Sequence, residues 1–217
     1  MSFLVFDLDG TLIDSRRDLA DAANALIVEH GGQPLPVDAI TSMVGEGAPL
    51  LVRRAIKAAG VDVDLRAALP RFLELYDERL LVHTRLYDGT RDALDRLASD
   101  AVMAILTNKP QHHTERILDE LRIAPLFRWV IGGDTPHGRK PEPAGLNHLM
   151  MLANTSPDDT IMVGDSPIDL RTARAAGTRL CIVQYGFGFD LTVPELRDRD
   201  IVAPSPSDLT ALLRPVS

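Results

Sequence analysis

The sequence has only one cysteine, no long apolar run and no excess of basic residues. Because a disulfide needs two thiols, Cys181 cannot form one within the chain, which fits a reducing compartment. A membrane-spanning helix needs about 20 consecutive apolar residues, and a nucleic-acid partner needs clustered Lys and Arg, whereas the net charge here is -8. We therefore expect a cytoplasmic protein, a monomer or a homodimer, with no nucleic-acid or membrane partner.

What the sequence does contain is the composition of an ordinary globular protein. Of its 217 residues, 45% are hydrophobic and 25% are charged, proportions that are typical of folded domains. A chain of this length can form one large domain, or a core domain that carries a smaller insert.

Short apolar runs of strand length recur along the chain, and helix-like stretches separate the later ones. Alternation of near-continuous apolar strands with helices is typical of a parallel sheet covered by helices on both faces. The sequence therefore predicts an α/β fold whose functional residues follow the carboxyl ends of the strands. The predicted strands are residues 3–6 (FLVF), 102–106 (VMAIL), 129–131 (WVI), 160–164 (TIMVG) and 180–184 (LCIVQ), with a short strand at 201–203 before a closing helix.

Residues 15–85 break this pattern, because helical signals follow one another there without a comparable strand. We therefore predict a helical cap domain at 15–85, inserted into a core domain formed by residues 1–14 and 86–217. Two neighbouring attachment points would allow the cap to hinge and exclude water. The predicted cap helices begin after an N-cap at Ser15, cover residues 49–59 and cover residues 65–81.

Polar residues follow four of the predicted strands, so a parallel sheet would bring them to one edge. Clustered carboxylates repel one another and resist desolvation, so they require a counter-charge. Because the available ligands are hard oxygens, with no Cys or His at ligand spacing, we expect this counter-charge to be Mg²⁺. In strand order the polar residues are Asp7, Asp9, Gly10 and Thr11, then Thr107 and Asn108, then Lys140, then Asp165, Ser166 and Asp169.

Taken singly, these residues have ordinary structural explanations. Asp7 and Asp9 could be solvent-exposed turn carboxylates, Lys140 could be a surface lysine, and Thr107 could cap a helix that begins near Pro110. Their convergence from four strands is what favours a functional site.

Four segments in this order carry a resemblance to a known family. They are DLDGT (7–11), the apolar run that ends in TN (107–108), the lysine of RKPEP (139–143) and VGDSPID (163–169). These segments resemble the four ordered motifs of the haloacid dehalogenase superfamily of phosphotransferases. The resemblance implies a Rossmann-like parallel sheet core with an inserted α-helical cap, and a phosphatase that forms an aspartyl-phosphate.

By this resemblance, the catalytic roles fall on strand-end residues. Asp7 is the nucleophile that attacks phosphorus, and Asp9 protonates the leaving oxygen and later deprotonates the attacking water. Thr107, the Asn108 backbone and Lys140 would hold the transferring oxygens, on which negative charge develops.

The resemblance also implies a Mg²⁺ site at the same edge. Asp7, the backbone carbonyl of Asp9 and Asp165 resemble the metal ligands, and Asp169 resembles the acid that orients them. Asp9 further disfavours halide displacement, because family members with that activity lack an aspartate at its position.

The cap segment VGEGAPLLVRRA (44–55) bears on the substrate. From spacing alone, Gly45 and Gly47 could form a loop that offers N–H groups to an anion beside Arg54, or merely a turn that links two helices beside a solvated arginine. The segment resembles the cap signature of phosphoglycolate phosphatases, as do TNKP (107–110) and YGF (185–187). The resemblance implies that Gly45, Gly47, Arg54 and Asn108 bind a small phosphorylated metabolite, with 2-phosphoglycolate the leading candidate.

Other functions stay open at this point. A sugar-phosphate phosphomutase, or a phosphatase for pyrophosphate or another sugar phosphate, would use Asp7 and Asp9 in the same way. A signalling receiver domain also phosphorylates an aspartate, but the long insert and the paired aspartates of DLD disfavour it.

Overall fold

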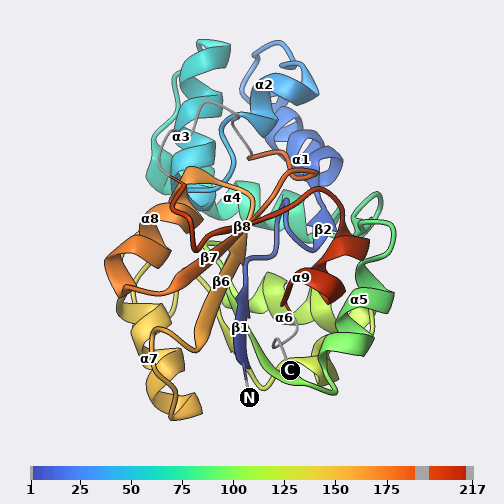
Figure 1. Ribbon diagram of the computed structural model, residues 1–217. Coiled ribbons are helices and arrows are strands. Elements are labelled where there is room, and N and C mark those ends of the chain that lie inside the picture. The colour runs from blue at the N-terminus through green and yellow to red at the C-terminus, as the bar shows by residue number, and fades with distance from the viewer. Residues whose placement is uncertain (1, 189–195, 214–217) are drawn as a thin grey trace. The chain divides into compact units, whose positions relative to one another are not determined.

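The computed structural model describes residues 2–188 and 196–213 and divides the chain into two compact units (Figure 1). The core unit comprises Met1–Ile13 and Leu86–Ser217, and the cap unit comprises Asp14–Arg85. The chain thus passes between the units after residue 13 and after residue 85. The sequence analysis predicts these boundaries after residues 14 and 85, so the first differs by one residue.

The core unit is built on a six-stranded sheet with the order β5-β4-β1-β6-β7-β8. Each of these neighbouring pairs is parallel, which confirms the predicted α/β fold. Every predicted strand is present, within one residue at either end. The strands are β1 (Ser2–Phe6), β4 (Ala101–Leu106), β5 (Trp129–Ile131), β6 (Thr160–Gly164), β7 (Arg179–Val183) and β8 (Ile201–Ala203).

Helices cover both faces of this sheet, with α7 and α8 on one side and α5, α6 and α9 on the other (Figure 1). This explains why the strands are apolar at successive positions, since Leu4 and Val5 point to opposite faces and both are fully buried. The helices are α5 (Thr90–Leu97), α6 (Gln111–Glu120), α7 (Ala144–Ala153), α8 (Pro167–Ala176) and α9 (Leu209–Leu213), with 3-10 turns η1 (Ala124–Leu126) and η2 (Pro206–Asp208).

The strand register brings the residues that follow the strands to one edge. Phe6, the last residue of β1, pairs with Ile105 of β4 on one side and with Val163 of β6 on the other. Because all three strands run in the same direction, the loops that follow them leave the sheet together. This edge is where the candidate site lies.

The cap unit is helical, as predicted. It contains one helix that the sequence analysis missed, the five-residue α2, and the strands β2 and β3 pair where the chain passes between the units. Ser15 occupies the N-cap position of α1, although its side chain makes no capping hydrogen bond. The elements are β2 (Ile13–Asp14), α1 (Arg16–Glu29), α2 (Val37–Thr41), α3 (Ala48–Ala59), α4 (Leu65–Asp77) and β3 (Arg85–Leu86).

Helix α4 ends at Asp77, four residues before the predicted end. After Asp77 the chain forms tighter turns, in which the N–H groups of Arg79 and Val82 donate to carbonyls three residues back. The chain then reaches Asp18, a buried carboxylate of α1. It accepts hydrogen bonds from the backbone N–H groups of His83 and Thr84 and from the Thr84 hydroxyl, at 2.7–3.0 Å. These bonds tie the segment after α4 to α1.

Within the described ranges, no helix is both long and apolar enough to cross a bilayer.

Candidate active site

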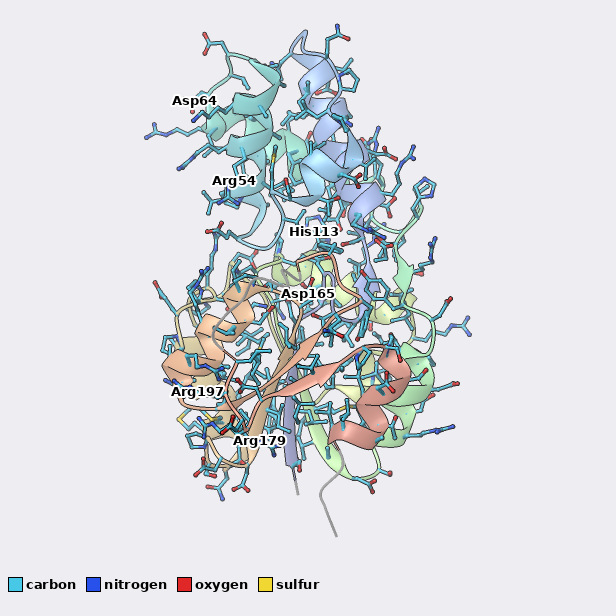
Figure 2. All side chains as sticks on the ribbon, turned by 45° about the horizontal axis from the view of Figure 1, so that its top comes forward. Arg54, Asp64, His113, Asp165, Arg179 and Arg197 are labelled. Carbon is cyan, nitrogen blue, oxygen red and sulfur yellow. The ribbon has the colours of Figure 1, made fainter. Side chains whose placement is uncertain are left out.

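Three buried carboxylates converge at the strand-end edge of the core unit. Asp7 follows β1, Asp165 follows β6, and Asp169 lies in the first turn of α8. One carboxylate oxygen from each of the three residues lies within 4.8 Å of the corresponding oxygens of the other two. Asp165 is seen where the loops leave the sheet in Figure 2. The structure therefore brings together the carboxylates of three of the four aspartates that the sequence analysis assigned to a metal site.

Lys140 lies among these acids, on the loop that follows β5. Its Nζ is 2.8 Å from Asp7 Oδ1 and 2.7 Å from Asp169 Oδ1. Burial lowers the pKa of this ammonium, but the nearby charges of Asp169 and Asp7 raise it to about 12. Lys140 therefore stays charged, and one ammonium faces three carboxylates.

The remaining negative charge makes ionisation of the acids costly. Burial raises the pKa of Asp7 to about 6, with Asp169 adding repulsion that Lys140 opposes. Burial, together with repulsion by Asp169 and Asp7, raises the pKa of Asp165 well above its ordinary value. The acids thus favour an additional positive charge, and an all-oxygen donor set of this kind could hold a hard divalent cation such as Mg²⁺.

The start of α8 holds Asp169 in place. Ser166 is the N-cap, and both its backbone N–H and its hydroxyl donate to Asp169 Oδ2, at 3.1 and 2.6 Å. This is a capping box, and Pro167 occupies the first helical position within it. The motif VGDSPID therefore does two things, because the residues that start the helix also orient an acid of the site.

Asp9 lies outside the group of three acids. Its carboxylate oxygens are 2.9 and 3.0 Å from Nζ of Lys109, a buried lysine that the sequence analysis did not select. Lys109 does lie within TNKP (107–110), a segment that the sequence analysis used only for the family resemblance. The carboxylate of Asp9 therefore faces Lys109 and is not part of the group formed by Asp7, Asp165 and Asp169.

Asn108 contacts Lys140 through its side chain. The amide nitrogen donates to the Lys140 carbonyl, and the amide oxygen accepts from the Lys140 N–H, both at 2.9 Å. This pair of bonds ties the loop that carries Lys140 to the end of β4. The sequence analysis considered only the Asn108 backbone, so this orienting contact is an addition.

Thr107 is buried beside Asn108 but does not cap the following helix. Helix α6 begins at Gln111 with Pro110 as its N-cap, and the Thr107 hydroxyl accepts a 3.3 Å bond from the Lys109 N–H. The capping alternative is therefore wrong, because Thr107 lies too far before the first helical turn. Its hydroxyl stays at the strand-end edge.

The cap residues form a separate group in the cap unit. Gly45 and Gly47 have φ of 117° and 88°, a region that favours glycine, and Gly47 is the N-cap of α3. Arg54 forms an ion pair with Glu46 and donates a 3.3 Å bond to the Met43 carbonyl. Arg54 is therefore held against the glycine loop, rather than being a freely solvated charge.

The ion pair of Lys109 with Asp9 gives a first prediction, on stability. Lys109→Met should lower the free energy of unfolding by about 3 kcal/mol, because it removes one partner of a largely buried pair and leaves the other charge behind. Urea denaturation without Mg²⁺ measures this loss. Lys57→Met is the matched control, since Lys57 is exposed on α3 and its loss should change the free energy by less than about 0.5 kcal/mol. Equal urea midpoints for the two variants would contradict the prediction.

Comparisons with known proteins find relatives over most of the chain. The family model of the haloacid dehalogenase-like hydrolases matches residues 4–183. The phosphoglycolate phosphatase of Pseudomonas putida (strain KT2440) is 42% identical over an alignment 221 residues long. The alignment covers 97% of this chain and 78% of that protein. Phosphoglycolate phosphatase 1 of Pseudomonas aeruginosa (strain PAO1) is 38% identical, covering 88% of this chain and 72% of that protein.

A solved structure shares the fold over nearly the whole chain. It is the crystal structure of a predicted phosphoglycolate phosphatase from Haemophilus somnus 129PT, with a TM-score of 0.89 and 28% sequence identity. The match covers 97% of each chain.

Proposed function

Because the chain belongs to the haloacid dehalogenase-like hydrolase family, we propose that it is a Mg²⁺-dependent phosphatase that converts 2-phosphoglycolate to glycolate and phosphate. The observation that carries the proposal is the buried group of Asp7, Asp165 and Asp169, with Lys140 bound to two of them at the strand-end edge. The names of the relatives support the choice of substrate.

In the first chemical step, an oxygen of the Asp7 carboxylate attacks phosphorus while the bond from phosphorus to the ester oxygen breaks. The leaving oxygen takes a proton from Asp9 and departs as the hydroxyl of glycolate. The product on the enzyme is an acyl phosphate on Asp7. The ammonium of Lys140, 2.8 Å from Asp7 Oδ1, favours the ionised form of this carboxylate, which is the nucleophilic form.

In the second step, water attacks the phosphorus of the acyl phosphate and gives a proton to Asp9. Inorganic phosphate leaves, and the Asp7 carboxylate and the protonated Asp9 are both restored. Thr107, the Asn108 backbone and Lys140 donate hydrogen bonds to the transferring oxygens in both steps. Mg²⁺, held by Asp7, Asp165 and the Asp9 carbonyl, would supply positive charge to the phosphoryl oxygens and to the acids.

The cap group would recognise the carboxylate of the substrate. In this proposal the N–H groups of the Gly45–Gly47 loop and the guanidinium of Arg54 bind the carboxylate of 2-phosphoglycolate, with Glu46 keeping Arg54 in place until the substrate arrives. Charge-assisted hydrogen bonds to a carboxylate are among the stronger polar contacts in proteins.

Replacement of Arg54 tests this assignment. Arg54→Gln should lower kcat/KM for 2-phosphoglycolate by about 10- to 100-fold, the range for loss of a hydrogen bond to a charged group. The rate with p-nitrophenyl phosphate, which has no carboxylate, should change little. Arg53→Gln is the matched control, because Arg53 is the exposed neighbour on the same helix. Equal losses on both substrates would exclude carboxylate recognition by Arg54.

A substrate panel tests the proposed function itself. Phosphate release with Mg²⁺ is measured from 2-phosphoglycolate, pyrophosphate, a glucose phosphate and an amino-sugar phosphate. We expect the highest kcat/KM for 2-phosphoglycolate. A preference for another ester would replace the substrate and keep the mechanism, whereas slow release that requires a bisphosphate activator would indicate a phosphomutase.

We also propose that the enzyme works in the cytoplasm on small metabolites, as a monomer or a homodimer, without nucleic-acid or membrane partners. The net charge of -8 supports the absence of a nucleic-acid partner, because it repels an extended phosphate backbone. Light scattering during size-exclusion chromatography distinguishes a monomer from a homodimer.

A further inference from the structure

The segment Tyr185–Gly188, which follows β7, lies directly against Asp165. The Gly188 N–H donates a 2.7 Å hydrogen bond to Asp165 Oδ2. The other carboxylate oxygen, Oδ1, accepts a 3.2 Å bond from the hydroxyl of Thr11, in the loop after β1. Each oxygen of this acid is therefore held from a different loop.

The packing around Asp165 leaves no room for a side chain at Gly186 or Gly188. A Cβ added at Gly186 would lie 2.3 Å from the Gly10 carbonyl oxygen and 2.4 Å from Asp165 Cβ, and one added at Gly188 would lie 2.9 Å from Asp165 Oδ2. Neither glycine has φ in the left-handed region. The reason for glycine at these positions is thus close approach to Asp165, not backbone conformation.

Tyr185 attaches the segment to the loop that carries the nucleophile. Its hydroxyl donates a 3.0 Å bond to the Thr11 carbonyl, and its ring packs edge-on against Tyr87, with 5.1 Å between centroids. Burial raises the pKa of the Tyr185 phenol, so the hydroxyl keeps its proton and remains a donor. The loop after β1 and the 185–188 segment therefore enclose Asp165 from two sides.

We propose that the 185–188 segment positions Asp165 for metal binding. The hydrogen bond from Gly188 and the close contact of Gly186 hold the Asp165 carboxylate in the orientation in which it faces Asp7 and Asp169. A carboxylate held in this way loses little rotational freedom when it binds a cation, and loss of such supporting contacts commonly lowers metal affinity about 10- to 100-fold. The inference rests on the proposed Mg²⁺-dependent function, but it concerns metal affinity rather than the choice of substrate.

The test is the Mg²⁺ affinity of the whole chain, measured by isothermal titration calorimetry without substrate. Gly186→Ala should raise the Kd for Mg²⁺ by about 10- to 100-fold, because the new methyl group must push Asp165 or Gly10 aside. Tyr185→Phe removes only the bond to the Thr11 carbonyl, so it should raise the Kd less and fold normally. It keeps the test decisive if Gly186→Ala does not fold.

Gly177→Ala is the matched control for lost stability. Gly177 has φ of 73°, and the nearest atom to an added Cβ there lies 4.0 Å away, so this variant is strained but distant from Asp165. Its Kd for Mg²⁺ should equal that of the wild type even if its melting temperature falls.

The outcomes separate this inference from the proposed function. A wild-type Kd in folded Gly186→Ala and Tyr185→Phe would overturn the positioning role and leave the phosphatase proposal intact. Failure of the wild type to bind Mg²⁺ would overturn both the metal assignment and the positioning role. If the wild type binds Mg²⁺ but prefers another phosphate ester, a raised Kd in the variants still supports the inference.

Discussion

Asp7→Asn should abolish phosphate release from 2-phosphoglycolate, with a loss on the order of 10⁴- to 10⁶-fold in kcat, the range found when a member of a nucleophilic catalytic unit is removed. The reason is that a neutral amide cannot replace the carboxylate oxygen that bonds to phosphorus. Initial rates of phosphate release at saturating Mg²⁺ measure the effect. Acid-quenched wild-type enzyme should carry the phosphoryl group on the peptide that contains Asp7.

The Asp7→Asn variant should remain folded. Burial raises the pKa of Asp7 from its ordinary value of 3.8 to about 6, so the ionised carboxylate destabilises the metal-free folded state at neutral pH. The neutral amide removes this cost, so the melting temperature without Mg²⁺ should equal or exceed that of the wild type. Asp92→Asn, at an exposed position of α5, is the matched control and should keep full activity. Substantial turnover by folded Asp7→Asn would remove Asp7 as the nucleophile.

Removal of divalent metal should abolish turnover as completely as loss of the nucleophile, and restoring Mg²⁺ should stabilise the fold. Mg²⁺ at a concentration of about 100 times its Kd should add about 2.7 kcal/mol to the free energy of unfolding, because the ion binds the folded chain and not the unfolded one. Thermal unfolding in EDTA and in Mg²⁺ measures the stabilisation, and rates of phosphate release in the same buffers measure the activity.

The stabilisation by Mg²⁺ should increase with pH, because Asp7 and Asp165 bind protons at low pH when the metal is absent. The pKa of Asp7 is raised to about 6 and that of Asp165 is raised well above its ordinary value, so the metal-free folded state holds protons that the unfolded state has released. The contribution of these groups to stability is therefore largest at low pH and is lost as the pH rises through their folded pKa values. Mg²⁺ replaces the protons, so its effect on the melting temperature should be larger at about pH 8 than at about pH 5.

Asp165→Asn is the control for the place where the metal binds. This variant lacks one of the three converging carboxylates, so Mg²⁺ should raise its melting temperature much less than that of the wild type. An equal rise in the variant and the wild type, at both pH values, would place the stabilising ion elsewhere on the chain.

The chain after α4 and the loop around Lys140 are held by contacts that the sequence pattern does not indicate. The apolar pattern of residues 65–81 is helical throughout, yet α4 ends at Asp77, and Asp18, far away in the sequence, accepts the N–H groups of His83 and Thr84 beyond it. In the same way, nothing in the order of residues indicates that the side chain of Asn108 binds the backbone of Lys140. In both places a polar group finds its partner only once the chain has folded.

By itself, the sequence determined the parallel sheet, the helical insert and the group of acids at one edge of the sheet. Apolar runs buried on both faces mark the strands, and the shared direction of parallel strands carries Asp7, Asp165 and Asp169 to the same edge. The sheet, the insert and the group of acids are consequences of local sequence pattern and of parallel topology.

Only the tertiary structure decided which groups hold the functional side chains. The pairing of Lys109 with Asp9 and the contact of Gly188 with Asp165 join residues that are 100 and 23 positions apart. Hydrogen bonds and ion pairs act over about 3 Å, and strand-end loops can take many paths, so the pattern of strands and helices does not specify which loop atoms meet. The packing of the folded core brings these atoms within bonding distance.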